Sequence, residues 1–99
     1  MTYSPWTYRP LRTIIDFMEK SKAVILRALG LMIREQRAAL GISQEELGLR
    51  CHLDRTYISG LERGVRNPSL TALVTLAKGL NITVSQLLEN LEIEIEKPE

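Results

Sequence analysis

One stretch of twenty residues, from Gln44 to Arg63, constrains the fold more than any other part of the chain. Counted from Gln44, apolar side chains occupy positions 4, 8, 10, 15 and 18, which are Leu47, Cys51, Leu53, Ile58 and Leu61. Position 5 is glycine, which is small enough for two helices to approach closely. This spacing is typical of two short helices joined by a tight turn, the helix-turn-helix arrangement. Few other helical hairpins meet all six requirements, so the pattern predicts this arrangement specifically.

The turn of this unit is the one place where its sequence departs from the usual pattern. Position 9, where glycine is common, is His52. A residue there needs a positive φ, which histidine adopts more readily than most residues. We therefore expect His52 to be a turn residue and its neighbour Cys51 to be a small buried apolar residue. We expect no metal site, because the chain has no second His or Cys to complete one.

Helix signals dominate the rest of the chain and predict an all-α fold of about five short helices. Residues 13–40 carry a helical pattern of apolar residues, weakened at Gly30 and ended by Gly41. Residues 43–46 and 83–86 each have the composition of a capping box, and Asp54 is a good N-cap. Residues 67–69 open one further helix. Only the short segment 93–96 alternates as a strand does.

Composition divides the sequence into three parts. Residues 1–20 are expected to form an N-terminal arm or an extra helix, with Pro5 and Pro10 interrupting regular structure near its beginning. Residues 21–91 form the predicted domain, and residues 92–99 an acidic tail. The arm is compatible with a disordered segment, an apolar latch or a long gene start, and its residues do not choose among these.

Size and charge exclude several classes of protein. A chain of 99 residues is one domain, and no stretch approaches the roughly 18 uncharged apolar residues that a membrane span needs. A single cysteine suits a reducing compartment, so we expect a cytoplasmic protein. Residues 26–86 hold eight Lys or Arg against five Asp or Glu, a mildly basic balance. The sequence has no phosphate loop, nucleophile–base pair or paired carboxylates in an apolar setting, so we do not expect an enzyme.

The residues in and around the helix-turn-helix unit also resemble a known family. Residues 37–47, 53–64 and 66–70 are similar, in order, to blocks of the Cro/C1-type (Xre) regulators, and the resemblance spans about residues 28–91. Within that family, one run resembles the controller proteins of restriction–modification systems: Asp54-Arg55-Thr56-Tyr57-Ile58-Ser59-Gly60. The resemblance implies a five-helix, lambda-repressor-like domain that dimerises and binds a two-fold symmetric operator.

The resemblance also implies which side chains contact DNA. It places Arg55, Thr56 and Ser59 at the start and on the exposed face of the second helix, the recognition helix. The forked guanidinium of Arg55 suits a guanine edge. Tyr57 would contact the DNA backbone or a deformed base step, and Gly60 would let the helix lie close to DNA. Ser43 and Gln44, at the N-terminus of the first helix, would bind a phosphate. Arg66 and Asn67, which follow the recognition helix, would bind a phosphate or a base edge at the flank.

Two further sets of residues have structural roles in this hypothesis. Arg37 and Glu62 match a pair that the family uses internally, an ion pair that ties the first helix to the third. The last helix carries more apolar side chains than so small a core needs, and we expect part of them to form a two-fold dimer interface: Val84, Leu87, Leu88 and Leu91. Such a dimer would require an inverted-repeat operator.

These observations predict a sequence-specific DNA-binding transcriptional regulator that binds an inverted-repeat operator as a homodimer, with restriction–modification control as the narrower hypothesis. The alternative is a protein-interaction module, such as an antitoxin or an adaptor, built on the same fold. The expected partners are double-stranded DNA and a second copy of the chain. We expect no cofactor, metal, membrane contact or small-molecule ligand. Activation and repression depend on promoter position, which lies outside this sequence.

Overall fold

The computed structural model describes residues 11–98, and every regular element in that range is a helix. The six helices of this range are α1 (Leu11–Leu40), α2 (Gln44–Cys51), α3 (Arg55–Glu62), α4 (Leu70–Gly79), α5 (Val84–Leu87) and α6 (Leu91–Glu96). The predicted all-α fold is confirmed. None of these helices combines the length and the apolar character needed to cross a membrane.

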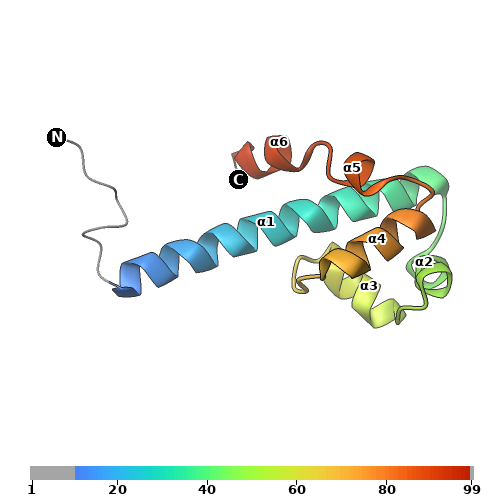
Figure 1. Cartoon of the computed structure of the whole chain (residues 1–99), viewed down its shortest axis with the longest axis horizontal. Coiled ribbons are helices and arrows are strands. Elements are labelled where there is room, and N and C mark those ends of the chain that lie inside the picture. The colour runs from blue at the N-terminus through green and yellow to red at the C-terminus, as the bar shows by residue number, and fades with distance from the viewer. Residues whose placement is uncertain (1–10, 99) are drawn as a thin grey trace.

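α1 is a single helix of 30 residues, around which the other helices are arranged. α2, α3 and α4 lie on one side of its C-terminal half, and α5 and α6 lie on the other side (Figure 1). The N-terminal half of α1 projects beyond the rest of the fold (Figure 1). The expected boundary between residues 20 and 21 therefore falls inside a continuous helix. Residues 1–10 of the predicted arm lie outside the described residues.

Gly30 does not interrupt α1, although the low helix propensity of glycine predicted a weakened helix at this position. The residue is buried where α1 meets the end of α3. A Cβ at this position would collide with the backbone carbonyl oxygens of Leu61 and Glu62. Glycine at this position therefore allows two helix backbones to approach closely, at the cost of some helix propensity.

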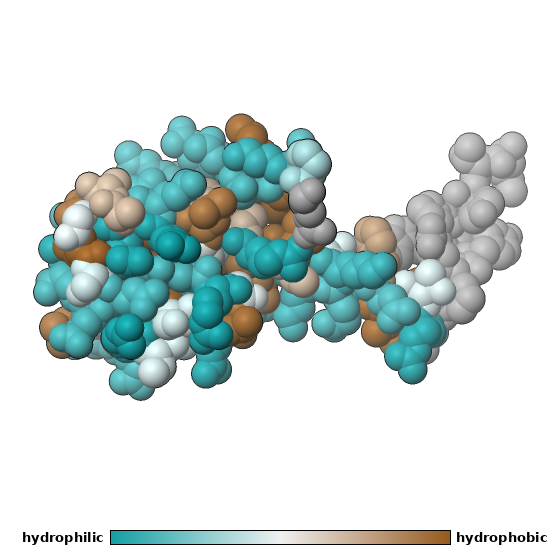
Figure 2. All heavy atoms as spheres, turned by 180° about the vertical axis from the view of Figure 1, so that it is seen from behind, coloured by the Kyte–Doolittle hydropathy of each residue, from teal (hydrophilic) through white to brown (hydrophobic). Residues whose placement is uncertain are grey.

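One hydrophobic core joins α1, α2, α3, α4 and α5. Its most deeply buried large side chains are Ile33, Leu47, Ile58, Leu61, Leu76, Leu80 and Leu87. Cys51 belongs to the same cluster and is 4% exposed, so its predicted role as a small buried residue is confirmed. Burial raises the pKa of the Cys51 thiol, which favours its neutral form. The face shown in Figure 2 is mainly hydrophilic, with hydrophobic side chains in separate patches.

Short polar residues begin the helices, although not all in the expected way. Thr83 and Gln86 form the complete capping box at the start of α5. Ser43 caps α2 by accepting a hydrogen bond from the Glu46 N–H at 3.0 Å, but the Glu46 carboxylate pairs with a later arginine instead of closing the box. Asp54 occupies the N-cap position of α3, yet its side chain makes no capping hydrogen bond. The first turn of α3 is therefore without a side-chain cap.

The C-terminal segment corrects two expectations. Residues 92–99 were expected to be an acidic tail, and 93–96 alternate as a strand does, but residues up to Glu96 form α6, which packs against α1. Leu87 was expected at a dimer interface, but it is fully buried, because α5 is only four residues long and packs against α1 and α4. The other three predicted interface residues are partly buried against the core and keep exposed surface: Val84, Leu88 and Leu91.

Candidate nucleic-acid interface

Backbone geometry fixes the turn between α2 and α3. His52 has φ 55° and ψ 42°, in the left-handed region, and its N–H donates to the carbonyls of Gly48 and Leu49. Gly48 lets the chain fold back onto α2, since a Cβ there would lie 2.5 Å from the Leu53 carbonyl oxygen. The predicted turn at His52 and close approach at Gly48 are both confirmed. α3 is thereby held at a defined orientation relative to α2.

α3 has one side in the core and one side facing solvent. Ile58 is fully buried, whereas Arg55 and Thr56 in the first turn are exposed. Ser59, one turn later, is half-buried, and its Oγ accepts a hydrogen bond from Arg63 Nε at 3.3 Å. The outer side of α3 therefore presents short polar and basic side chains, the groups that read base edges and grip phosphates.

Arg66, in the loop after α3, lies back across that helix. Its Cζ atom is 6.0 Å from the centroid of the Tyr57 ring, at the limit of a cation–π contact. Gly60 is buried beneath the same side chain, because a Cβ on Gly60 would lie 2.7 Å from Arg66 Cγ. Arg66 therefore covers this part of the helix in the structure, and the expectation that Gly60 lets α3 lie close to DNA stays a prediction.

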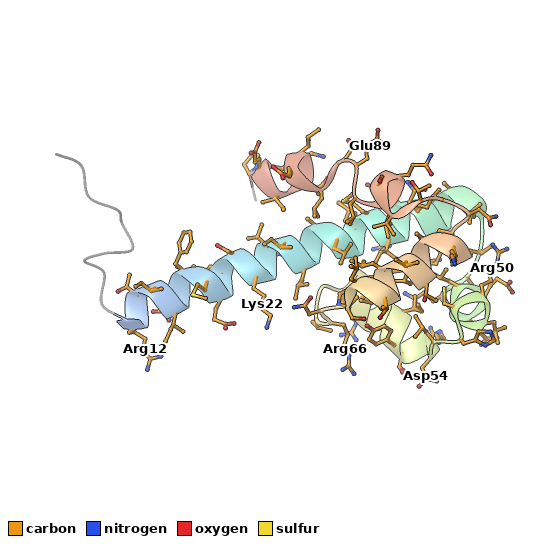
Figure 3. All side chains as sticks on the ribbon, in the orientation of Figure 1. Arg12, Lys22, Arg50, Asp54, Arg66 and Glu89 are labelled. Carbon is orange, nitrogen blue, oxygen red and sulfur yellow. The ribbon has the colours of Figure 1, made fainter. Side chains whose placement is uncertain are left out.

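The remaining predicted contact residues lie at the start of α2 and in the loop after α3. The Ser43 hydroxyl, although it accepts the capping hydrogen bond, still has a hydrogen to donate. Gln44 Nε2 donates to Glu62 Oε1 at 3.1 Å, so this side chain is anchored to the end of α3. Asn67 is exposed. Arg66 projects toward the same side of the molecule as Asp54, at the other end of α3 (Figure 3).

The ion pair between Arg37 and Glu62 forms as the resemblance implied. Arg37 Nε donates to Glu62 Oε2 at 2.6 Å and Arg37 Nη2 donates to Glu62 Oε1 at 3.0 Å, which is a bidentate arrangement. Arg37 Nη1 also donates to the Ile42 carbonyl at 2.8 Å. The Glu62 side chain is only 4% exposed. Its hydrogen bond raises the pKa of Arg37 further above its ordinary value, so the guanidinium stays charged throughout the physiological range.

Sequence reasoning missed two of these contacts and overlooked a third that has a local signal. The Gln44–Glu62 hydrogen bond and the contact of Arg66 with the Tyr57 ring both join residues from different elements, so no helical spacing indicates them. The Ser59–Arg63 hydrogen bond joins residues four apart on one helix, a spacing that places side chains next to each other.

The match with a family model follows this geometry. Residues 33–87, more than half of the chain, match the helix-turn-helix family. The chain belongs to the helix-turn-helix family. The Cro/C1-type character expected from its sequence blocks is confirmed. The matched range contains the whole of α2, α3, α4 and α5, together with the C-terminal end of α1.

Curated relatives of this helix-turn-helix protein include control proteins. It is 45% identical over 53 residues to the control protein C.MunI of a Mycoplasma species. This alignment covers 54% of this chain and 72% of the relative. It is 46% identical over 48 residues to the control protein C.BamHI of Bacillus amyloliquefaciens. This alignment covers 48% of this chain and 59% of the relative.

Solved helix-turn-helix structures align with nearly their whole length. The restriction–modification controller protein C.AhdI from Aeromonas hydrophila aligns with a TM-score of 0.62 and 45% identity, over 63% of this chain and 94% of its own. The controller protein C.Esp1396I, a tetramer in complex with its natural 35-base-pair operator, aligns with a TM-score of 0.67 and 38% identity, over 74% of this chain and 96% of its own. Most of the unmatched length therefore belongs to the present chain.

Replacing Glu62 with glutamine tests what the ion pair contributes. The Glu62→Gln side chain keeps its shape but no longer neutralises Arg37, so the free energy of unfolding should fall by about 2–4 kcal/mol, near the cost of breaking a buried pair. Urea unfolding followed by circular dichroism measures this change. Glu46→Gln, the same change in a more exposed pair with Arg50, should cost less than about 1 kcal/mol. Equal losses in the two variants would contradict the proposed importance of the pair.

Proposed function

We propose that this protein is a sequence-specific DNA-binding transcriptional regulator that binds an inverted-repeat operator as a homodimer. The observation that carries the proposal is the fixed α2–turn–α3 unit, whose second helix turns a polar and basic side outward. Similarity to control proteins and to an operator-bound controller supports the narrower proposal that the regulated genes belong to a restriction–modification system. A cytoplasmic location is part of this proposal.

Base recognition would come from the exposed start of α3. Arg55 can place two donors on the O6 and N7 acceptors of a guanine in the major groove. Thr56 and Ser59 are short enough to leave the helix close to the base edges, and Tyr57 would contact the backbone or a deformed step. The exposure of Arg55 and Thr56 supports this assignment.

Phosphate contacts would orient α3 in the groove. Ser43 and Gln44 stand at the N-terminus of α2, where backbone N–H groups and the helix dipole favour an anion. Arg66 and Asn67 follow α3 and are exposed, so they can contact the backbone of the same half-site. The anchoring of Gln44 to Glu62 supports this role, because a held side chain loses less freedom on binding.

Dimerisation would use the apolar surface that remains exposed near the C-terminus. Val84, Leu88 and Leu91 keep partial exposure after packing on the core, whereas Leu87 is excluded by its burial. A two-fold axis through this surface would set two copies of α3 about 34 Å apart, one turn of DNA.

No catalytic step or cofactor is needed for this function, and we propose that the protein is not an enzyme. The alternative, an antitoxin or adaptor that mainly binds another protein, uses the same fold. Similarity to control proteins favours the regulator. Binding of one DNA sequence by the purified protein alone distinguishes the two, because an adaptor would need its protein partner.

Salt titration tests whether the interface grips phosphates as proposed. Two subunits would neutralise on the order of 6–8 phosphates, so the logarithm of affinity should fall against the logarithm of salt concentration with a slope of about −5 to −7. Fluorescence anisotropy with a duplex that the protein selects from a random library measures this slope. A slope near zero would exclude the proposed interface.

Arg55→Ala tests base reading. The loss of a bidentate contact should cost about 1–3 kcal/mol per half-site on the selected duplex, and much less on duplexes already changed at the guanine that Arg55 reads. Thermal stability should stay nearly unchanged, because Arg55 is exposed. If the effects of the protein change and of the base changes were additive at every base pair tested, Arg55 would not read sequence.

Leu88→Glu tests the dimer surface. A charge at this position should leave the variant monomeric at tens of micromolar in analytical ultracentrifugation and weaken operator binding at least about tenfold, since half-sites would bind independently. Ile93→Glu is the control, because Ile93 is 61% exposed and lies outside the proposed surface. Circular dichroism checks that both variants are folded. A Leu88→Glu protein that remained dimeric would refute this interface.

A further inference from the structure

The chain reverses direction after α3 through a turn whose geometry is set by the backbone. The Val65 N–H donates to the Gly60 carbonyl at 2.9 Å, and the Gly64 N–H donates to the Leu61 carbonyl at 3.1 Å. Together with φ 78° at Gly64, these bonds make a Schellman motif. A Cβ on Gly64 would lie 2.9 Å from the Cα of Arg27 in α1, so the turn is also held against the longest helix. The turn thereby brings Arg66 back alongside α3.

The returning chain places Arg66 where a side chain of α3 would otherwise be. Gly60 is buried, and the atoms nearest to a Cβ built on it belong to the loop that follows α3. A Cβ on Gly60 would be 2.7 Å from Arg66 Cγ and 3.6 Å from Val65 Cγ2. The aliphatic part of Arg66 therefore packs directly on the helix backbone at this position.

The head of Arg66 then lies one helical turn toward the start of α3. Tyr57 and Gly60 are three residues apart, so they share a side of the helix. Arg66 Cζ is 6.0 Å from the centroid of the Tyr57 ring. The guanidinium is exposed and projects toward the side of the molecule that also carries Asp54 (Figure 3). Arg66, although it belongs to the loop, thus forms part of the surface along α3.

We propose that Gly60 is a positioning residue for DNA binding: the absence of its side chain holds Arg66 along α3, with the guanidinium presented beside Tyr57. This inference rests on the proposed function, in which Arg66 contacts the operator. A long flexible side chain that is already placed loses less conformational freedom on binding than one extended into solvent. Any side chain at position 60 would displace Arg66 without touching DNA itself.

Stability separates this role from a structural one. Alanine forms helix better than glycine, and the atom it would meet belongs to a side chain that can move into solvent. Gly60→Ala should therefore unfold at the same urea concentration as the wild type or a higher one. A residue needed only for packing would instead lower that midpoint.

A double-mutant cycle on the selected duplex tests the proposal. Arg66→Ala should weaken binding about tenfold per half-site, the size of one good charged contact. Gly60→Ala should weaken binding about threefold or more, on the same scale. The double variant should bind within about twofold of Arg66→Ala alone, because Gly60 acts only through Arg66. In the matched cycle with Arg55→Ala, which removes the proposed base-reading arginine in the first turn of α3, the two losses should add.

Additive losses in the Gly60 and Arg66 cycle would overturn the proposal, and so would a Gly60→Ala protein that binds like the wild type. If Arg66→Ala binds like the wild type, the premise that Arg66 contacts DNA falls while operator binding stands. If the wild-type protein selects no duplex, the proposed function itself fails.

A measurement without DNA keeps the structural part testable in every case. In the wild type, the Arg66 methylene protons should show upfield ring-current shifts from Tyr57 in NMR spectra. These shifts should disappear in Tyr57→Leu and in Gly60→Ala. Shifts that persist in folded Gly60→Ala would show that Arg66 keeps its place without the glycine, which overturns the proposal.

Discussion

The guanidinium of Arg37 connects three segments that must stay together for α3 to be presented. It binds both carboxylate oxygens of Glu62 at the end of α3 and the carbonyl of Ile42 before α2. Glu62 in turn accepts a hydrogen bond from Gln44 in the first turn of α2. Both ends of the helix-turn-helix unit are therefore tied to α1 through one charged group. Because Glu62 is almost fully buried, the pair also excludes arrangements that would leave either charge without its partner.

The apolar core packs together the same helices that Arg37, Glu62 and Gln44 connect. Ile33 of α1, Leu47 of α2 and Ile58 of α3 are all fully buried in one cluster, so the three helices that the ion pair joins also share their packing. Gly30 brings α1 and α3 close enough for the arginine to reach. The hydrophobic contacts supply most of the stability, whereas the charged pair selects one relative placement of the helices.

Local sequence patterns predicted the features that depend on neighbours along the chain. The spacing of apolar residues around Gly48 and the turn at His52 indicated how α2 and α3 meet, and Thr83 with Gln86 indicated where α5 begins. Patterns failed where tertiary packing decides. Leu87 has the composition of an interface residue but is enclosed by α1 and α4. The alternating segment 93–96 is helical because α6 lies on α1. Gly60 is covered by a residue six positions later, which no helical period indicates.

The continuous α1 has a mechanical consequence. From Leu11 to its contact with α3 at Gly30 the helix has no break, a length of about 28 Å at 1.5 Å per residue. A group attached to the beginning of α1 would thus be held at a fixed distance from the region where α1 contacts the end of α3 and the following turn, at Gly30 and Arg27. The helix also fixes a direction. Inserting one residue into the projecting half would rotate everything before it by about 100° around the helix axis. The number of residues between that group and the contact with α3 therefore sets the direction in which the group faces relative to α3.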